Sequence, residues 1–478
     1  MIDNKISKNF IAPDSSNRLD IENIINKLIT QLIDFLSNAN KHPPYPEVKI
    51  FSREHFNIPN NGLSIDEIQT SLNTIYTHSM NPANKNYIGH MDSVSNIYAI
   101  LGEMIAAAIN NNMLSLEMSP FLTQLEYGLI KEFCDLFGLT QNSGGIIVSG
   151  GSIANLQALI VARNHTLNLQ GGCLIGVNQT PVILCSELAH ASISKAAMLM
   201  GIGVQNVIKV AINEHLQMCE TDLEKKINES LVNNCKPIAI VATAGTTVTG
   251  SIDSITNISN IANKYSIWLH VDAIYGGALI FSENYKHLIQ GINKANSISF
   301  NPQKWLYVAK TSSMVLFNDF NNMVNNFRIA APYMKEQENY INLGEITIQG
   351  SHHAEVLKLW LSLLAIGKNG YNQLINHGYE LTSICKQEIY KRNFLKLVTT
   401  PEVNICCFRI ALDNYDNDEI TLKIHEYLLK QGFFVSIPRL LGKLCLRMVL
   451  LNPFTDNTVI INLFNEIDKF IASLKKSN

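Results

Sequence analysis

Short apolar runs alternate with helical patterns through the middle of this 478-residue chain. The runs lie at 145–148, 181–185, 207–210, 237–243, 267–271, 297–300 and 313–317. A strand that is covered by helices on both faces reads as a nearly continuous apolar segment. The alternation therefore predicts an α/β domain of three layers, in which helices cover both faces of a mostly parallel sheet.

The two ends of the chain have different patterns. Apolar residues recur at three- and four-residue spacing from Leu19 to Leu36, which describes an amphipathic helix that must bury one stripe against another surface. Residues 64–67 read SIDE, a capping box that opens a second helix. After a helical pattern at 354–366, strand patterns at 405–410 and 444–450 lie between further helices. We expect a helical N-terminal segment over 1–110, a large domain over 111–370 and a small α+β domain over 371–478.

Charge and cysteine content narrow the class of protein. The 37 basic and 40 acidic residues give a net charge of −3 without a long run of either sign, so nothing favours binding to nucleic acid. The nine cysteines form no CxxC pair, and Cys406 and Cys407 lie in an apolar strand pattern, which predicts reduced thiols in a cytoplasmic protein. The first residues show no signal-like apolar region, and no apolar run is long enough to span a bilayer. We expect the protein to bind neither a membrane nor a metal ion.

A glycine pair follows the first apolar run, and ligands of open α/β sheets bind beyond the carboxyl ends of the strands. Gly150, Gly151 and Ser152 stand directly before Leu156 and Leu159, which begin a helical pattern. Bare backbone amides at the positive end of a helix suit a phosphate group. A tight turn without a ligand explains so short a glycine motif equally well.

Two charged residues stand at the ends of later strands. Asp272 ends the run at 267–271, where a buried carboxylate is costly unless it meets a cation, although most such residues cap the next turn. Lys304 follows the run at 297–300 among apolar neighbours, a place where lysine is seldom needed for structure.

A carboxylate, a phosphate-binding turn and a lysine are the parts that hold pyridoxal phosphate. Asp272 would keep the pyridine nitrogen protonated, and Lys304 would form the Schiff base that the substrate amine displaces. His190 also follows an apolar strand and is placed to stack on the cofactor ring, but taken singly it reads as an ordinary turn histidine. The residues thus predict a pyridoxal 5'-phosphate enzyme.

The chain resembles the group II pyridoxal-phosphate-dependent amino-acid decarboxylases of fold type I, which include glutamate, cysteine sulfinate, aromatic amino-acid and diaminobutyrate decarboxylases. The matching motifs are NM at 112–113, EMSP at 117–120, SGGSIAN at 149–155, AH at 189–190, ATAGTT at 242–247, HVDAIYGG at 270–277, NPQKW at 301–305, KLW at 358–360 and LR at 446–447. The resemblance runs from about residue 81 to the C-terminus.

This resemblance implies a role for each matching residue. Lys304 is the expected Schiff-base lysine, Asp272 the partner of the ring nitrogen and His190 the stacking residue. The remaining expected cofactor contacts are Gly151 and Ser152 at the phosphate, with Asn301 nearby, and Thr246 and Ala273. His90 belongs to the expected substrate loop at 86–92. The resemblance also implies a homodimer with active sites at the interface.

Three departures from the family pattern are visible. Gln303 stands where the family commonly has His, so this side chain can donate a hydrogen bond but cannot titrate. His352 and His353 stand where an Arg usually precedes the KLW helix, so a fixed cation is lost or replaced by a titratable group. Asn81-Pro82 replaces the usual HP pair.

The expected reaction is removal of the α-carboxylate of an L-amino acid, followed by return of a proton to Cα. The family gives that proton transfer to a tyrosine on a loop before the KLW helix, and Tyr340 is the nearest candidate, with Tyr333 second. Oxidative deamination to an aldehyde is an alternative reaction of related enzymes. A non-catalytic protein that kept the fold is disfavoured because Lys304, Asp272 and His190 are all present.

Arg447 bears on the substrate. It stands in an apolar strand pattern, where an arginine is costly unless it pairs with an acid from protein or ligand. The segment resembles the place where glutamate decarboxylases set an arginine against a substrate carboxylate, which favours glutamate, aspartate or cysteine sulfinate. A salt bridge to a helix acid such as Glu466 is the structural alternative, and aromatic amino acids and diaminobutyrate stay open as substrates.

Overall fold

The computed structural model describes residues 4–169, 171–330, 332 and 340–477, and its centre is a seven-stranded sheet. The strands follow the order β1 (Gly144–Val148), β7 (Ser313–Phe317), β6 (Ser297–Phe300), β5 (Trp268–Asp272), β4 (Cys235–Thr243), β2 (Thr180–Ser186) and β3 (Val207–Val210). β7 pairs antiparallel with β1 and β6, and the other neighbours are parallel. Each strand coincides with a predicted apolar run, which confirms the mostly parallel sheet and the α/β fold class.

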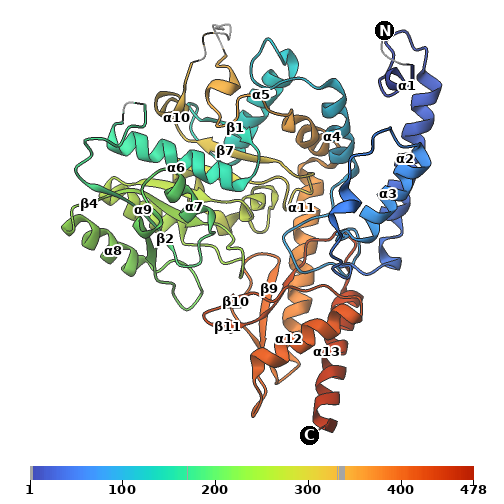
Figure 1. The fold of residues 1–478 in the computed structure, drawn as a ribbon. Coiled ribbons are helices and arrows are strands. Elements are labelled where there is room, and N and C mark those ends of the chain that lie inside the picture. Colours follow the sequence, from blue (N-terminus) through green and yellow to red (C-terminus); the bar gives the residue numbers. More distant parts are fainter. Residues whose placement is uncertain (1–3, 170, 331, 333–339, 478) are drawn as a thin grey trace.

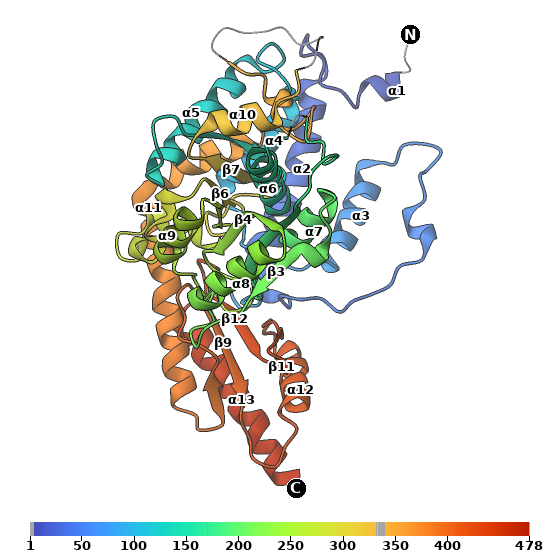
Figure 2. The ribbon, with the colours of Figure 1, turned by 90° about the vertical axis from the view of Figure 1, so that its left-hand side faces the viewer.

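Helices cover this sheet on both sides. They are α5 (Pro120–Leu136), α6 (Gly151–Leu167), α7 (Ser192–Leu199), α8 (Glu220–Val232), α9 (Ile255–Tyr265) and α10 (Phe320–Phe327). Figure 2 shows α6 and α7 on one side of the sheet and α9 on the other. α6 contacts β1, β4, β5, β6 and β7, so it packs across the middle of the sheet.

The long helix α11 (Glu355–Tyr390) leads from the sheet domain into a C-terminal lobe (Figure 1). It is interrupted at Gly367, whose φ of 66° and ψ of 170° are not helical. The lobe contains the sheet β8 (Leu395–Leu397), β9 (Ile405–Ile410) and β12 (Leu446–Val449), the short pair β10 (Arg439–Leu440) and β11 (Lys443–Leu444), and the helices α12 (Asn417–Lys430) and α13 (Asn457–Ser477). This α+β arrangement is the one that the sequence patterns predict.

The N-terminal helices are α1 (Asn4–Ser7), α2 (Arg18–Ser37), α3 (Ile65–Thr77) and α4 (Ile97–Ile109). The predicted capping box is present, with Ser64 and Glu67 each bonding the other's backbone amide. α2 and α3 contain no buried residue, although the rings of Phe35 and Tyr76 stack at 4.7 Å. The two helices form an arm, residues 18–77, that stands away from the sheet domain (Figure 1). The apolar stripe of α2 is therefore only partly covered within this chain, with Leu28, Ile29 and Leu32 half-buried.

All nine cysteines are free thiols. Cys406 and Cys407 are buried in β9, as the strand pattern predicts. Within the described ranges, no helix is both long enough and apolar enough to cross a membrane.

Candidate active site

A cavity of about 210 Å³ lies at the carboxyl ends of the parallel strands. It is lined by Gly151, Ser152, His190, Thr243, Gly245, Thr247, Asp272, Ile274, Tyr275, Asn301 and Lys304. These residues come from the ends of β1, β2, β4, β5 and β6 and the turns that follow, which meet because those strands run in the same direction. The cavity is smaller than the ~300–1,000 Å³ of drug-sized sites and suits a compact ligand.

The N-terminus of α6 supplies two free backbone donors. Within the described part of the chain, the amides of Gly151 and Ser152 donate to no acceptor. Gly150 has a φ of +114°, and a Cβ on Gly151 would lie 2.4 Å from Ile274 Cδ1 and 3.1 Å from Asn301 Nδ2. The glycines therefore let the backbone approach the cavity closely, and the free amides at the positive helix end suit an anion.

Lys304 extends into the cavity with little to hold its amine. Its Nζ lies 3.7 Å from Met91 Sδ and forms no ion pair with a carboxylate of the described residues. Burial lowers the pKa of Lys304, against the opposing charges of Asp272 and Asp92. A larger share of the amine is thus neutral and nucleophilic at a given pH.

Asp272 is only 4% exposed and is held by neutral donors. Its Oδ2 accepts a hydrogen bond from Asn155 Nδ2 at 2.9 Å, and its Oδ1 accepts one from the Ile274 amide at 3.2 Å. No lysine or arginine among the described residues pairs with it, so the carboxylate is available to a cationic N–H in the cavity.

His190 stands at the exposed side of the cavity. Its Nδ1 accepts a hydrogen bond from the Ser192 amide at 3.1 Å and lies 2.8 Å from Ser192 Oγ. The proton of the neutral ring therefore belongs on Nε2. Partial desolvation lowers the pKa of His190, and the positive charge of Lys304 lowers it further while Asp272 raises it.

These groups fit pyridoxal phosphate. The amides of α6 match a phosphate, the Lys304 amine matches an aldehyde, and the Asp272 carboxylate matches a protonated ring nitrogen. Asn301 Oδ1 and Thr243 Oγ1 are buried at the cavity and have no hydrogen-bond partner among the described residues, as expected where a polar ligand completes the site. Six of the predicted residues line the one cavity: Gly151, Ser152, His190, Asp272, Asn301 and Lys304.

Two predicted cofactor contacts are not among the lining residues. The hydroxyl of Thr246 lies 2.8 Å from Thr249 Oγ1 and accepts from the Ser251 amide, so it stabilises its own turn. Ala273 is fully buried and is not a lining residue of the cavity. Their neighbours Thr247 and Ile274 line the cavity in their place, because successive residues of a tight turn point in different directions.

Sequence reasoning assigned no role to Asn155, although it lies inside the SGGSIAN motif. It is fully buried on α6, where its amide contacts Asp272. The available signal is its position four residues after Gly151, one helical turn along the same face of α6.

His90 and Arg447 lie together beside the cavity. Arg447 Nη2 is 3.2 Å from His90 Nδ1, and Arg447 Nη1 donates at 2.6 Å to the carbonyl of the cavity-lining Thr247. The alternative salt bridge to Glu466 is wrong, because that carboxylate pairs with Lys469 and accepts a hydrogen bond from Tyr427.

The two tyrosine candidates remain predictions. The ring of Tyr340 packs edge-on against Tyr127 of α5 at 5.5 Å, and Tyr340 does not line the cavity of its own chain. Tyr333 lies outside the described residues.

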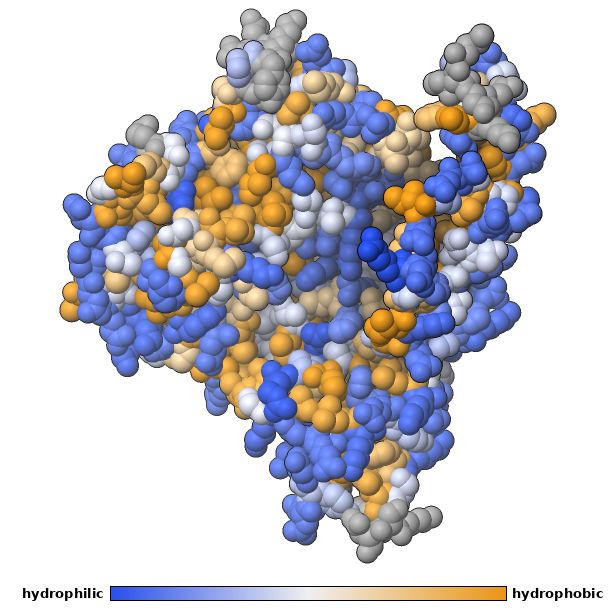
Figure 3. All heavy atoms as spheres, in the orientation of Figure 1, coloured by the Kyte–Doolittle hydropathy of each residue, from blue (hydrophilic) through white to orange (hydrophobic). Residues whose placement is uncertain are grey.

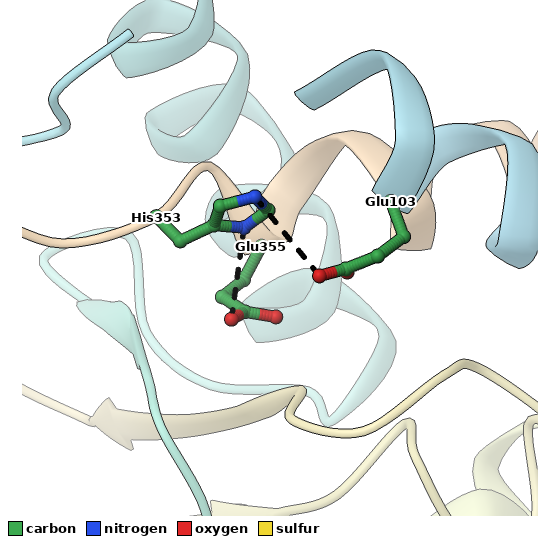
Figure 4. A group of neighbouring side chains, drawn as sticks. All are labelled: Glu103, His353 and Glu355. Carbon is green, nitrogen blue, oxygen red and sulfur yellow. Dashed lines mark ion pairs between the residues drawn. The ribbon is translucent and has the colours of Figure 1, made fainter. Parts of the chain in front are cut away.

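The departures from the family pattern lie around the site. Gln303 Oε1 accepts from the Ser312 amide at 2.6 Å, so it holds the two sides of its own turn together. His352 Nδ1 lies 2.8 Å from the Gly350 carbonyl. His353 lies within 4.0 Å of Glu103 and 3.8 Å of Glu355, so a titratable group does meet acids here (Figure 4).

Glu103, His353 and Glu355 have the side-chain types of a metal site. The buried ammonium of Lys358 contacts both carboxylates, at 2.6 Å from Glu103 and in a close ion pair with Glu355. A cation already balances the acids, which makes this cluster a junction between α4 and α11.

The sheet order, the lysine at the end of β6 and the carboxylate at the end of β5 define a fold type I pyridoxal-phosphate enzyme. The chain belongs to the pyridoxal-dependent decarboxylase family, since the model of the pyridoxal-dependent decarboxylase conserved domain matches residues 50–411. It is therefore a pyridoxal-phosphate-dependent amino-acid decarboxylase.

Characterised relatives differ in the substrate that their names state. An aspartate 1-decarboxylase of Aliivibrio fischeri is 30% identical over 84% of this chain and 82% of its own. An aromatic-L-amino-acid decarboxylase of Bacillus atrophaeus is 27% identical over 86% of each chain, and an acidic amino acid decarboxylase of Xenopus tropicalis is 27% identical over 90% and 88%.

Solved structures agree with the fold. Mouse CSAD in its apo form has a TM-score of 0.87 at 24% identity, covering 95% of this chain and 99% of its own. Rhodiola rosea 4-hydroxyphenylacetaldehyde synthase has a TM-score of 0.87 at 20% identity, covering 97% and 99%. At these identities the likeness concerns the fold alone.

Proposed function

We propose that this enzyme decarboxylates an acidic L-amino acid, namely glutamate, aspartate or cysteine sulfinate, and that Arg447 binds the side-chain acid group. The observation that carries the proposal is a buried guanidinium beside the cavity without a carboxylate of the described residues to pair with it. The names of two relatives, an aspartate and an acidic amino acid decarboxylase, support the same substrate class.

Arg447 is 6% exposed and bonded only to neutral groups. Its Nε donates to Ser436 Oγ at 2.8 Å and its Nη2 to the Gly89 carbonyl at 3.0 Å, in addition to the bonds with Thr247 and His90. A guanidinium has five N–H groups, so these four bonds leave one on Nη1 for a ligand.

Burial alone does not distinguish this arginine. Arg163 on α6 is 8% exposed and also bonds neutral acceptors, the Met200 and Gly172 carbonyls and Asn164 Oδ1. Arg447 differs because it touches the cavity-lining Thr247 and because its charge reaches Lys304, where it adds to the burial that lowers the pKa of that lysine. An anionic substrate group near Lys304 would therefore be attracted by the positive charge of Arg447.

The other residues take roles that follow from their positions. Lys304 binds the cofactor aldehyde, Asp272 faces the ring nitrogen, and His190 covers the ring from the exposed side. Gly151 and Ser152 bind the phosphate, with Asn301 beside them. When bound, pyridoxal phosphate supplies a conjugated ring that accepts the electron pair left as carbon dioxide departs.

The substrate proposal is tested by Arg447→Lys, with kcat/KM measured for acidic and for aromatic amino acids. Lysine keeps the charge but loses the planar fork, so we expect kcat/KM for the acidic substrate to fall by ~1.5–3 kcal/mol of transition-state binding, with little change for aromatic substrates. Arg163→Lys is the matched control, since it alters another buried arginine away from the cavity.

Equal losses for both substrate classes would assign Arg447 to the α-carboxylate that all substrates share and would remove the argument for an acidic substrate. Unchanged kinetics with a lower melting temperature, as expected of Arg163→Lys, would make Arg447 structural.

A second candidate function is oxidative deamination to an aldehyde. It is favoured by the position of Tyr340, which packs on Tyr127 and does not line the cavity of its own chain. Release of carbon dioxide with peroxide and ammonia would identify this reaction, whereas carbon dioxide with an amine product is the result expected of a decarboxylase.

We also propose that the enzyme is a homodimer. α4 exposes an apolar stripe at helical spacing, formed by Ile97, Leu101, Met104, Ile105 and Ile109, each at least 36% exposed. The arm leaves its own stripe only partly covered, and a deep recess separates it from the body of the molecule (Figure 3). A second copy of this chain that occupies the recess would bury both stripes.

A further inference from the structure

One buried line of hydrogen bonds connects the strands beneath the cavity with the two residues that contact its ligand. Trp268 Nε1 donates to Ser297 Oγ at 2.9 Å, and Ser297 Oγ lies 2.9 Å from His270 Nδ1. His270 Nε2 lies 3.1 Å from Asn155 Oδ1, which also accepts from Ser299 Oγ. Asn155 is the point where this line divides.

The side-chain amide of Asn155 donates in two directions. Its Nδ2 donates to Asp272 Oδ2 at 2.9 Å and to Ser192 Oγ at 2.9 Å, and Ser192 Oγ lies 2.8 Å from His190 Nδ1. Asn155 and Ser299 are fully buried and Ser192 is 1% exposed, so water does not compete for these bonds.

The carboxylate of Asp272 fixes the direction of these bonds. A carboxylate can only accept, so Asn155 presents its Nδ2 to Asp272 and its Oδ1 to His270. An amide oxygen also only accepts, so His270 donates from Nε2, in keeping with burial that lowers the pKa of His270 to about 4 and keeps the ring neutral. Both N–H groups of Asn155 then point to Asp272 and Ser192.

We propose that Asn155 is the positioning residue that sets Asp272 and His190 relative to one another, so that the carboxylate faces the ring nitrogen while the neutral imidazole covers the ring face. The inference rests on the proposed roles of these two residues. Asn155 contributes two donors and no charge, which no carboxylate or aliphatic side chain of the same size can do.

The test compares Asn155→Leu with Gln157→Met, which removes another fully buried amide from the same helix. Gln157 Nε2 donates to the Ile346 carbonyl at 2.7 Å and does not line the cavity, so both variants lose buried amide bonds of α6. The dissociation constant of pyridoxal phosphate is measured by titration of the apoenzyme. We expect it to rise about 10- to 100-fold in Asn155→Leu, as for a lost bond to a charged group, and to stay near the wild-type value in Gln157→Met.

Asn155→Asp gives a second readout in case Asn155→Leu does not fold. Two adjacent carboxylates share one proton at low pH, and the protonated one then donates to the other as the amide does. The affinity for the cofactor, taken relative to wild type at each pH, should therefore approach the wild-type value in acid and fall in alkali. A purely structural role predicts a lower melting temperature without this pH dependence.

Ser192→Ala separates the two branches. It removes the hydroxyl that joins Asn155 to His190 and keeps the bond from Asn155 to Asp272. The backbone amide at position 192 still donates to His190 Nδ1, so histidine ¹⁵N spectra of the holoenzyme should keep the Nε2–H form while the affinity changes less than in Asn155→Leu. Equal affinities in Asn155→Leu and Gln157→Met, or a pH-independent ratio in Asn155→Asp, would overturn the inference. A wild-type protein that binds no cofactor would instead refute the proposed function.

Discussion

At the scale of single residues, the proposed chemistry depends on Lys304, a lysine that the fold leaves almost without partners. Lys304 Nζ has only the Met91 sulfur within hydrogen-bonding distance among the described residues, and burial lowers its pKa. Nearby Lys310 is more exposed and forms an ion pair with Asp92. Burial without an ion pair keeps more of the Lys304 amine neutral and nucleophilic, and Lys310 lacks this environment.

Lys304→Ala should therefore abolish turnover and the visible absorbance of the lysine-bound cofactor. Borohydride reduction attaches the cofactor permanently to its lysine, and mass spectrometry then locates this label. The label should lie on the peptide that contains Lys304 in the wild-type enzyme and in Lys310→Ala. A label on a different lysine in Lys304→Ala, with retained colour, would contradict it.

At the scale of elements, α5 is joined to strand β1 by a buried acid. Glu126 Oε1 accepts from the Ile147 amide at 2.8 Å, and burial raises the pKa of Glu126 to about 8. Between pH 4.5, the ordinary pKa of this carboxyl group, and about pH 8, Glu126 is thus protonated in the folded protein and ionised in the unfolded chain. The stabilisation is complete below the lower value and is lost as the pH rises through the upper one.

Replacing this acid with an amide should remove the pH dependence. The free energy of unfolding of the wild-type protein should carry a contribution that falls by about 1.4 kcal/mol per pH unit between these pKa values, and Glu126→Gln should lack it. Urea unfolding of both proteins from mildly acidic to neutral pH measures the difference. Glu132→Gln, an exposed acid on the same helix, is the control. Parallel curves for Glu126→Gln and wild type would show that Glu126 is ionised in the folded protein.

At the scale of the whole molecule, the arm and α4 leave apolar surface that one chain does not cover. The stripe of α4 recurs every three to four residues, as a helix face does when it packs against a partner. Single exposed apolar residues are normal on a protein surface, but a continuous apolar stripe of this kind is typical of an interaction surface.

The double variant Leu101→Asp, Ile105→Asp should convert the proposed dimer into monomers, because each charge would be buried in the interface. Light scattering after size exclusion measures the mass. Leu422→Asp on α12 is the control, since Leu422 is 43% exposed and lies outside the α4 stripe. A wild-type protein that is already monomeric at micromolar concentration would refute the homodimer.

The sequence by itself determined the sheet, the capping box at Ser64 and the lysine and carboxylate at the strand ends, because these depend on local periodicity and on which residue follows a strand. Only the tertiary structure decided which turn residues point inward, as with Thr247 in place of Thr246. It also decided the partners of buried groups: Arg447 meets His90 and not Glu466, and Asn155 joins Asp272 to His190. Such contacts join segments far apart in the chain, so their geometry exists only once the sheet order has brought the strand ends together.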